Sequence, residues 1–354
     1  MKAWNLHTIG DIRYEDVKAP VPQDNEVLIK VMAAGICGSD IPRIYNTGAH
    51  KMPLIPGHEF AGIVEEVGDS AFSNLKGKRV SVFPKIPCGK CPQCLSGRKN
   101  LCTSYDYVGS RRDGAFAEYV TVPRENLFIL PESVDYKVGA MAEPMAVAVN
   151  TVRKVMGLCA GKNYEEQKIA ICGMGTIGLM VLMFLMDAGF KDIYVIGNKK
   201  IQRELAVKLG LSEERFCDST KEEPRSALIT RAGAVNFYIE CVGKEDTILM
   251  GLDVTEPCGN IILVGNPYSD VLMKRDIYWK ILRNQLTLTG IWNSVFDGSN
   301  SDDWHYLFNR LESGNFYPEQ LITHELPLDK LDKGLAVMRD KTEEYCKIMI
   351  NGKP

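Results

Sequence analysis

Apolar residues occur in short runs over the first 122 positions, separated by glycine, proline and asparagine. Four runs stand out: EVLIKVMAAGI (26–36), AGIVEEVG (61–68), KRVSVF (78–83) and FAEYVTV (116–122). Apolar runs of this length, bounded by turn-forming residues, are typical of β-strands. The pattern therefore predicts a barrel-like, β-rich domain, followed by a helical stretch at about 138–155.

From residue 168 the pattern changes to an alternation of strands and helices. Strands are predicted at KIAIC (168–172), DIYVI (192–196), NFYIECVG (236–243) and NIILVG (260–265). Helices are predicted at 176–189 and at 201–210, where Gly210 is the expected C-cap. After about residue 290 the pattern is irregular again. This alternation is typical of a doubly wound parallel sheet, so we expect an α/β domain that follows and interrupts the β-rich one.

A glycine-rich turn joins the first of these strands to its helix. Gly173, Gly175 and Gly178 form G-x-G-x-x-G, in which the glycines permit a tight turn, close approach of a pyrophosphate and close packing of helix on strand. The first N–H groups of the helix would face the phosphate. The predicted cofactor contacts are Gly173, Gly175, Thr176, Ile177 and Gly178 in the turn, and Val242 and Val264 at the ends of two later strands.

The next strand departs from the usual NAD pattern. An acidic residue should end it and bind the ribose 2′-OH of NAD, but Gly197 is followed by Asn198, Lys199 and Lys200. The missing carboxylate removes repulsion of a 2′-phosphate, and the lysines could pair with one, which favours NADP slightly over NAD. Alternatively, Lys199 and Lys200 are a solvated helix start and NAD binds without the acid.

Composition narrows the class of protein. The chain has 354 residues, enough for two domains, and its net charge of −3 gives no basic field for nucleic acid. The longest apolar run, near 177–186, is too short to span a membrane, and the N-terminal residues lack the apolar core of a signal peptide. We expect a soluble cytoplasmic protein.

Eleven cysteines must then be explained under reducing conditions, where clusters are typical of metal or catalytic sites. Cys88, Cys91, Cys94 and Cys102 have the spacing C-x2-C-x2-C-x7-C. Four thiolates close a tetrahedral zinc shell, which makes a structural site. The residues between them lack the C-P ending of bacterial iron–sulfur motifs. The isolated cysteines are expected to be small core residues: Cys159, Cys172, Cys217, Cys241, Cys258 and Cys346.

A second set of possible zinc ligands is scattered along the chain. Cys37 lies in GICGSD, His58 and Glu59 lie in PGHEFAG, and Glu143 lies in MAEPMAV. One cysteine, one histidine and a carboxylate leave a coordination position for water or substrate, as in catalytic zinc sites.

Taken together, these pieces resemble the zinc-dependent medium-chain alcohol and polyol dehydrogenase family. The resemblance rests on GICGSD, GHEFAGIVEEVG, the four-cysteine segment, FAEYV, AEP and GMGTIG, in the family's order and over essentially the whole chain. It implies a GroES-like catalytic domain at 1–148, with a structural zinc lobe at 85–105. A Rossmann dinucleotide-binding domain at 149–287 follows, and 288–354 return to the catalytic domain.

The resemblance also implies roles for individual residues. Cys37, His58 and Glu143 match the catalytic zinc ligands, and Glu59 matches an adjacent carboxylate that reaches the metal directly or through its water. Ser39 matches the hydroxyl that relays the alcohol proton. Pro42 stands where some members carry a relay histidine, so the proton would leave through Ser39 to cofactor ribose or water, with Glu59 as an alternative base.

Within the family, the branch that oxidises galactitol 1-phosphate is the most similar, on residues 37–50, 105–119 and 278–294. Arg111 and Arg112 could bind the substrate phosphate, because guanidinium binds phosphate bidentately; Arg43, Lys274 and Arg275 are further candidates. Alternatively, the arginine pair is a surface feature or forms an ion pair with Asp106 or Asp113.

Other functions remain open at this point. The substrate could be an unphosphorylated polyol such as sorbitol, 2,3-butanediol or threonine. A zinc-binding module without enzyme activity, which binds nucleic acid or protein, is the alternative from another class, and the acidic balance counts against it. The resemblance implies two zinc ions per chain and a homodimer or homotetramer.

Overall fold

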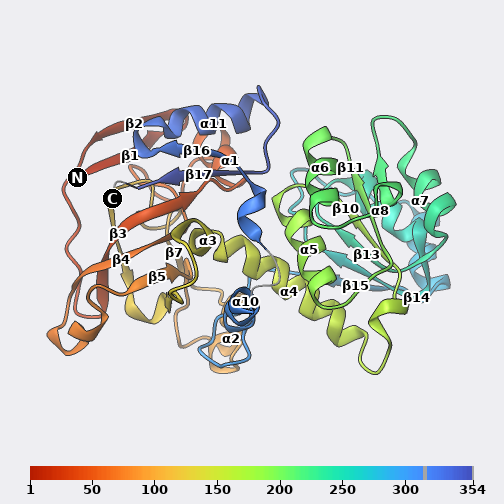
Figure 1. Ribbon diagram of the computed structural model, residues 1–354, viewed down its shortest axis with the longest axis horizontal. Helices are drawn as coiled ribbons and strands as arrows, with labels where there is room; N and C mark the ends of the chain where they lie inside the picture. Colours follow the sequence, from red (N-terminus) through yellow and green to blue (C-terminus); the bar gives the residue numbers. More distant parts are fainter. Residues whose placement is uncertain (314–316, 353–354) are drawn as a thin grey trace. The chain divides into compact units, whose positions relative to one another are not determined.

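The computed structural model describes residues 1–313 and 317–352. It has two compact units, Met1–Ala146 with Ser294–Pro354, and Val147–Asn293. Figure 1 shows the elements of both units. Among the described residues, no helix combines the length and the apolar character needed to cross a bilayer.

The first unit is built on a seven-stranded sheet with the order β16-β17-β3-β4-β5-β9, in which β8 also pairs with β3. Its strands are β3 (Glu26–Gly35), β4 (Glu59–Val67), β5 (Arg79–Val82), β8 (Tyr119–Pro123), β9 (Leu127–Ile129), β16 (Ile322–Pro327) and β17 (Lys347–Asn351). All neighbours are antiparallel except β16 and β17. The four predicted strands correspond to β3, β4, β5 and β8. Strand β17, near the C-terminus, pairs with β3 of the N-terminal part of the chain (Figure 1).

Smaller elements complete this unit. The strands are β1 (Lys2–Thr8), β2 (Asp11–Asp16), β6 (Lys85–Ile86) and β7 (Asp106–Tyr107). The helices are α1 (Asp40–Pro42), α2 (Pro92–Leu95), α3 (Tyr136–Ala140), α10 (Asp303–Glu312), α11 (Leu331–Asp340) and the first residues of α4 (Ala142–Leu158). The predicted helix at 138–155 is thus two helices, α3 and α4. The sequence analysis did not predict the β1–β2 hairpin or any element after residue 290.

The second unit contains a six-stranded parallel sheet with the order β12-β11-β10-β13-β14-β15. Its strands are β10 (Ile169–Cys172), β11 (Ile193–Gly197), β12 (Phe216–Asp218), β13 (Val235–Glu240), β14 (Thr255–Leu263) and β15 (Thr287–Gly290). The doubly wound sheet is confirmed, including the order reversal beside β10 that forms a ligand crevice in such folds. The prediction missed β12 and β15, which have three and four residues. Because β15 belongs to this sheet, residues 288–293 lie in the second unit and not in the first.

Helices pack on this sheet as two groups. They are α5 (Thr176–Asp187), α6 (Lys200–Lys208), α7 (Pro224–Ala232), α8 (Glu245–Val254) and α9 (Arg275–Arg283). Helix α5 packs against α6, and α8 packs against α7 and α9. The C-cap of helix α6 is Leu209, and Gly210 follows it with φ 109°, so the predicted cap Gly210 lies one residue beyond the observed one.

The isolated cysteines differ in their surroundings. Cys159, Cys172, Cys217 and Cys346 are buried, as predicted. Cys241 is half-buried and Cys258 is exposed, so the core prediction is wrong for Cys258. All eleven cysteines lie in the described residues and are free thiols.

Candidate functional site

The four clustered cysteines converge between β6 and β7. Their Sγ atoms all lie within 4.8 Å of one another, with 3.5 Å between Cys91 and Cys94 and 3.8 Å between Cys91 and Cys102. Zinc–sulfur bonds of about 2.3 Å in a tetrahedron separate the sulfurs by about 3.8 Å. The lobe therefore fits a zinc ion with four sulfur ligands.

The surroundings of these thiols shift the pKa values of Cys91 and Cys94 in opposite directions. Hydrogen bonds from backbone N–H groups, first that of Cys94, lower the pKa of Cys91 to about 6. Burial raises the pKa of Cys94 to about 12. At neutral pH the metal-free lobe thus keeps a proton on Cys94, and metal binding must displace it.

The second group lies where two paired strands end. Cys37 follows β3, while His58 and Glu59 stand at the start of β4, and Gly35 pairs with Glu59 in the antiparallel register. The ligand atoms of Cys37, His58 and Glu59 lie within 4.8 Å of one another. One sulfur, one imidazole and one carboxylate form a donor set that fits a zinc ion with an open position.

Asp40 lies next to both Cys37 and His58 of this group. It is fully buried, and its carboxylate accepts hydrogen bonds from the Cys37 N–H at 3.0 Å and from the Arg43 guanidinium at 2.5 Å. Its Oδ1 is 3.5 Å from Nδ1 of His58. A carboxylate on that side of the ring favours Nε2 as the atom that binds a metal. Burial alone would raise the pKa of Asp40, but the nearby His58 lowers it.

Glu59 also forms a buried ion pair with Lys347 of β17, and both side chains are 2% exposed. The Lys347 ammonium also donates to the carbonyl of Ile36 at 3.1 Å. Burial alone would lower the pKa of Lys347, but the Glu59 carboxylate raises it. A Cβ at Gly35 would lie 2.7 Å from Cε of Lys347, so glycine leaves room for the pair. No pattern in the sequence indicates this pair, because its partners are 288 positions apart.

Glu143, the predicted third ligand, is not in this compact group. It lies in the first turn of α4 and accepts a hydrogen bond from the Tyr107 hydroxyl at 3.3 Å. Burial raises the pKa of Glu143 to about 7, while His58 lowers it and Glu59 raises it. The ring of Tyr107 meets that of His58 edge to face, with centroids 5.8 Å apart. Sequence reasoning missed Tyr107, since a lone tyrosine carries no ligand spacing.

Ser39 lies beside the same group. Its hydroxyl donates to the Cys37 sulfur at 3.3 Å, and its side chain is exposed. A solvent-facing hydroxyl next to a metal ligand is suited to pass a proton to or from a bound alcohol. Pro42 is the last residue of the short helix α1.

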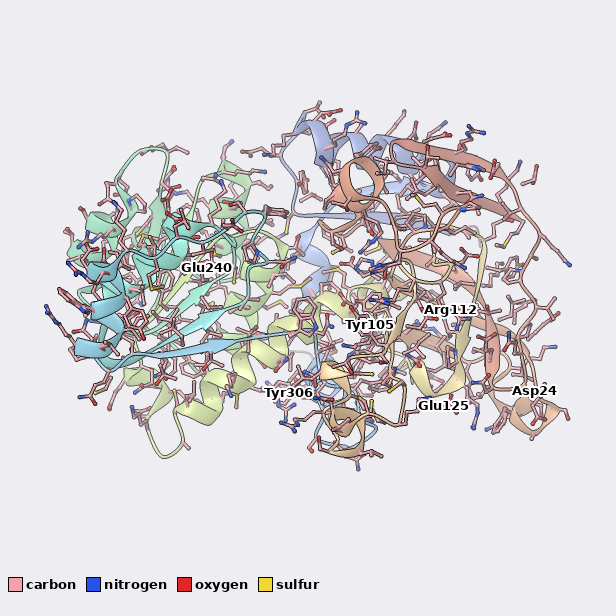
Figure 2. The ribbon with its side chains drawn as sticks, turned by 180° about the vertical axis from the view of Figure 1, so that it is seen from behind. Asp24, Tyr105, Arg112, Glu125, Glu240 and Tyr306 are labelled. Carbon is pink, nitrogen blue, oxygen red and sulfur yellow. The ribbon has the colours of Figure 1, made fainter. Side chains whose placement is uncertain are left out.

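The two arginines after the Gly-Ser turn have different surroundings. Arg112 pairs with the buried carboxylate of Glu26 at 2.5 Å, so we withdraw it as a phosphate ligand; neither Asp106 nor Asp113 is its partner. Figure 2 marks Arg112 and Tyr105. The Arg111 guanidinium lies 4.5 Å from the centre of the Tyr105 ring. Among the described residues, the buried Nε of Arg111 has no hydrogen-bond partner.

The remaining phosphate candidates are elsewhere. Arg43 is committed to Asp40. Lys274 caps α9, and Arg275 stacks on Trp279 at 5.1 Å, both in the second unit.

The three glycines of the dinucleotide turn have distinct environments. Gly173 has φ 96°, and a Cβ there would lie 2.5 Å from Cγ2 of Val242. A Cβ at Gly178 would collide with the carbonyl of Gly173, whereas one at Gly175 would meet nothing within 4 Å. The turn is therefore packed on both sides and open at Gly175, the N-cap of α5, where a pyrophosphate could approach the helix N-terminus.

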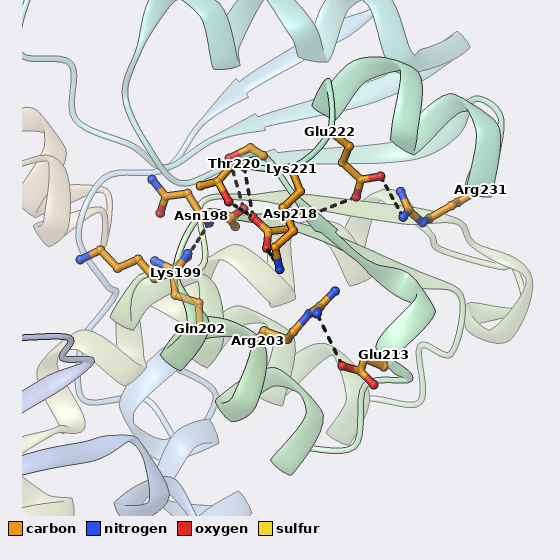
Figure 3. Close-up of polar contacts among 12 residues, drawn as sticks. Asn198, Lys199, Gln202, Arg203, Glu213, Asp218, Thr220, Lys221, Glu222 and Arg231 are labelled. Carbon is orange, nitrogen blue, oxygen red and sulfur yellow. Dashed lines mark hydrogen bonds and ion pairs between the residues drawn. The ribbon is translucent and has the colours of Figure 1, made fainter.

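The end of β11 is crowded where an acid was expected. A Cβ at Gly197 would lie 2.6 Å from the Phe216 ring and 2.8 Å from Oε1 of Gln202. That oxygen accepts the N–H groups of Asn198 and Lys199 (Figure 3). The geometry thus leaves no room for a carboxylate at 197 without a shift of neighbours.

A cavity of about 730 Å³ opens beside this strand end, in the second unit. Its lining includes Asn198, Lys200, Arg203, Asp218, Thr220 and Lys221. Hydrogen bonds from Thr220 and the charge of Lys221 lower the pKa of Asp218 to about 2. Arg203 is 3.6 Å from Glu213 (Figure 3). The cavity therefore combines cations with one fixed carboxylate.

The buried pair Glu59–Lys347 generates a stability prediction. In metal-free protein, Lys347→Met should lower the free energy of unfolding by about 3–5 kcal/mol, because it leaves a carboxylate buried without its partner. Lys347→Arg keeps the charge and is the control. The double variant Lys347→Met/Glu59→Gln should recover much of the loss. Urea unfolding measures all four proteins, and a Lys347→Met variant as stable as the parent would contradict the pair's role.

Comparison with known proteins agrees with these features. The alcohol dehydrogenase GroES-like domain family matches residues 23–132, and the glucose dehydrogenase C-terminus family matches residues 136–348. The chain is 33% identical over 326 residues to galactitol 1-phosphate 5-dehydrogenase of Escherichia coli K12, which covers 92% of each chain.

Solved structures share the fold. A zinc-binding dehydrogenase of Sinorhizobium meliloti 1021 with NADP bound superposes with a TM-score of 0.87 at 28% identity, over 99% of this chain and 98% of that one. An alcohol dehydrogenase of E. coli CFT073 in complex with NADH gives 0.87 at 25% identity, over 99% of both chains. The chain belongs to the zinc-dependent medium-chain alcohol and polyol dehydrogenases, enzymes that act on a CH–OH group.

Proposed function

We propose that the chain oxidises a secondary alcohol of a polyol to a ketone and transfers the hydride to NAD(P). The observation that carries this proposal is the donor set of Cys37, His58 and Glu59, gathered within the reach of one metal ion. Zinc held there supplies a Lewis acid that lowers the pKa of an alcohol hydroxyl. The four-cysteine lobe would hold a second, structural zinc.

The chain's own residues divide the remaining work. Cys37 and His58 would hold the metal, with Glu59 or Glu143 as the carboxylate ligand. Ser39 is the exposed hydroxyl at the group and would accept the alcohol proton. Because Glu59 is already paired with Lys347, it is less suited than Ser39 to act as the base. Asp40 keeps the imidazole of His58 in place.

Arg111 is our proposed ligand for a substrate phosphate. Its guanidinium stacks on Tyr105, whose ring centroid is 6.2 Å from that of Tyr107, and Tyr107 in turn contacts His58 and Glu143. The ammonium of Lys85 also lies 4.1 Å from the centre of the Tyr105 ring. Two cations on Tyr105 make an electropositive region near the donor set, which supports a phosphorylated polyol such as galactitol 1-phosphate.

For the cofactor we propose NADP as the preferred dinucleotide. The crowded position of Gly197, which excludes the usual ribose-binding acid, supports it. The carboxylate of Asp218 on the neighbouring strand favours NAD over NADP. The two solved relatives described above contain NADP and NADH respectively, so the dinucleotide must be measured for this chain.

We further propose a homo-oligomer, a dimer or a tetramer, in the cytoplasm. Tyr278 and Leu282 on α9 and Leu288 on the edge strand β15 are exposed apolar side chains, and grouped apolar exposure is typical of interaction surfaces. None of the eleven cysteines, all within the described residues, forms a disulfide, which suits a reducing compartment.

Metal content tests the two zinc assignments. The purified protein should contain two zinc ions per chain. Cys37→Ala should lose one zinc and all turnover while its melting temperature stays near that of the parent, because the lobe remains intact. Cys88→Ser should lose the other zinc and lower the melting temperature first. Retained turnover in Cys37→Ala would refute the catalytic assignment.

A substrate matrix tests the polyol, the phosphate and the dinucleotide together. It measures kcat/KM with NAD and NADP for galactitol 1-phosphate, galactitol, sorbitol, 2,3-butanediol and threonine. We expect the highest value with galactitol 1-phosphate and NADP. Arg111→Ala should lower it by about 10- to 100-fold for the phosphorylated polyol alone, since it removes charged hydrogen bonds.

Arg112→Ala is the matched control, because Arg112 is paired with Glu26 and should not discriminate between galactitol and its phosphate. An equal effect of Arg111→Ala on both substrates would exclude the phosphate role. A clear preference for NAD would exclude the NADP assignment.

Light scattering tests the assembly. The scattering mass should be two or four times that of one chain, and Leu282→Glu should lower it, because a charge would then enter the apolar surface. A monomeric parent protein at micromolar concentration would contradict the proposal.

A further inference from the structure

A buried carboxylate in the second unit has no role in the function proposed so far. Glu240 ends β13 and is fully buried (Figure 2). Its Oε1 accepts hydrogen bonds from the N–H groups of Val242 at 2.8 Å and Gly243 at 2.9 Å, and from the Thr247 hydroxyl at 2.7 Å. Its Oε2 is 3.1 Å from the Gly243 nitrogen. Both oxygens are thus bound to the loop that follows their own strand.

Dipoles, and no cation, stabilise this charge. Within the part of the chain that the structure describes, no lysine, arginine or histidine lies at ion-pair distance from Glu240. The carboxylate instead faces the first residues of α8, where Thr247 lies and where a helix favours an anion. Its hydrogen bonds come from the loop before α8 and from the Thr247 side chain, whereas the N-terminus of α5 is open at Gly175.

Glu240 also joins this loop to the next one. Its carbonyl accepts the N–H groups of Val264 at 2.8 Å and Gly265 at 2.9 Å. A Cβ at Gly265 would lie 2.5 Å from Oε2 of Glu240, and one at Gly243 would lie 2.5 Å from the Asn266 carbonyl. The loops after β13 and β14 are therefore packed against each other through Glu240.

The first of these loops reaches the dinucleotide turn, because Val242 packs against Gly173. In the sheet, β10 lies between β11 and β13, and β14 lies on the other side of β13. In such a crevice the pyrophosphate lies at the β10–α5 turn and one nucleoside extends toward β11. The other half of the dinucleotide, which carries the nicotinamide, then extends over the loops that Glu240 joins.

We propose that Glu240 is a positioning residue for the nicotinamide half of the dinucleotide. It fixes the loops at 241–243 and 264–266 in the shape that this half requires. The inference rests on the proposed dehydrogenase function. Its specific consequence is that loss of the carboxylate weakens binding of the whole dinucleotide but not of its adenosine half.

The test compares two ligands on the same variants. Glu240→Gln keeps the size of the side chain but turns an amide NH2 toward N–H donors. The Kd for NADPH, measured by fluorescence titration, should rise about tenfold, as expected for a lost hydrogen bond to a charged group. The Kd for ADP, which spans only the adenosine half and the pyrophosphate, should stay within about twofold of the parent value.

Two further variants keep the test decisive. If Glu240→Gln does not fold, Thr247→Val removes one hydrogen bond to the same carboxylate and should show a smaller split in the same direction. Asp246→Asn removes an exposed carboxylate from the same helical turn, and controls for charge alone. Equal weakening of NADPH and ADP, or no change in either, would overturn the inference.

This result is distinguishable from failure of the proposed function. A parent protein that binds neither NADPH nor NADH would refute the dehydrogenase proposal. A parent protein that binds one of them, with variants that show no split between dinucleotide and ADP, would refute only the role of Glu240.

Discussion

The end of β3 and the start of β4 bury carboxylates that need cations beside them, and the first unit is arranged around this constraint. Asp40 and Glu59 are buried with His58 near Cys37, and Glu143 is buried against Tyr107. Lys347 and Arg43 pair with Glu59 and Asp40, and, although burial opposes it, the Asp40 carboxylate raises the pKa of His58 well above its usual value. Burial of unpaired charge is costly, and burial indeed raises the pKa of Glu143 to about 7. The donor set of Cys37, His58 and Glu59, gathered within the reach of one metal ion, is the physical reason to place zinc there.

Strand pairing builds this site from distant parts of the chain. The β3–β4 register brings Gly35 opposite Glu59, and β17 then adds Lys347 from near the C-terminus. In the second unit, hydrogen-bond donors are what interacts with negative charge. It leaves the N-terminus of α5 open at Gly175, and it binds the carboxylate of Glu240 through the N–H groups of Val242 and Gly243. The open helix end is suited to an anion that must be bound, whereas the loop N–H groups hold a carboxylate of the chain itself.

Local patterns predicted much of this arrangement, whereas long-range pairings were out of reach. The sequence predicted the doubly wound sheet, four strands of the first unit and the four-cysteine lobe, because periodicity and ligand spacing are short-range signals. It did not reveal the Glu59–Lys347 pair, the Tyr107–Glu143 contact or the partner of Arg112, since these depend on strand register. It also missed β12 and β15, whose three and four residues are too few for a pattern. In the sequence Glu240 is an ordinary strand residue, and its hydrogen bonds could not be predicted from it.

Zinc K-edge X-ray absorption of the purified protein distinguishes two chemically different zinc sites on one chain from a single site. We expect two zinc ions that share five cysteine sulfurs, so the average zinc has between two and three sulfur neighbours, with nitrogen and oxygen completing the shell. In Cys37→Ala the remaining zinc should have four sulfur neighbours and no others. A single zinc per chain with an all-sulfur shell in the unmodified protein would contradict the account.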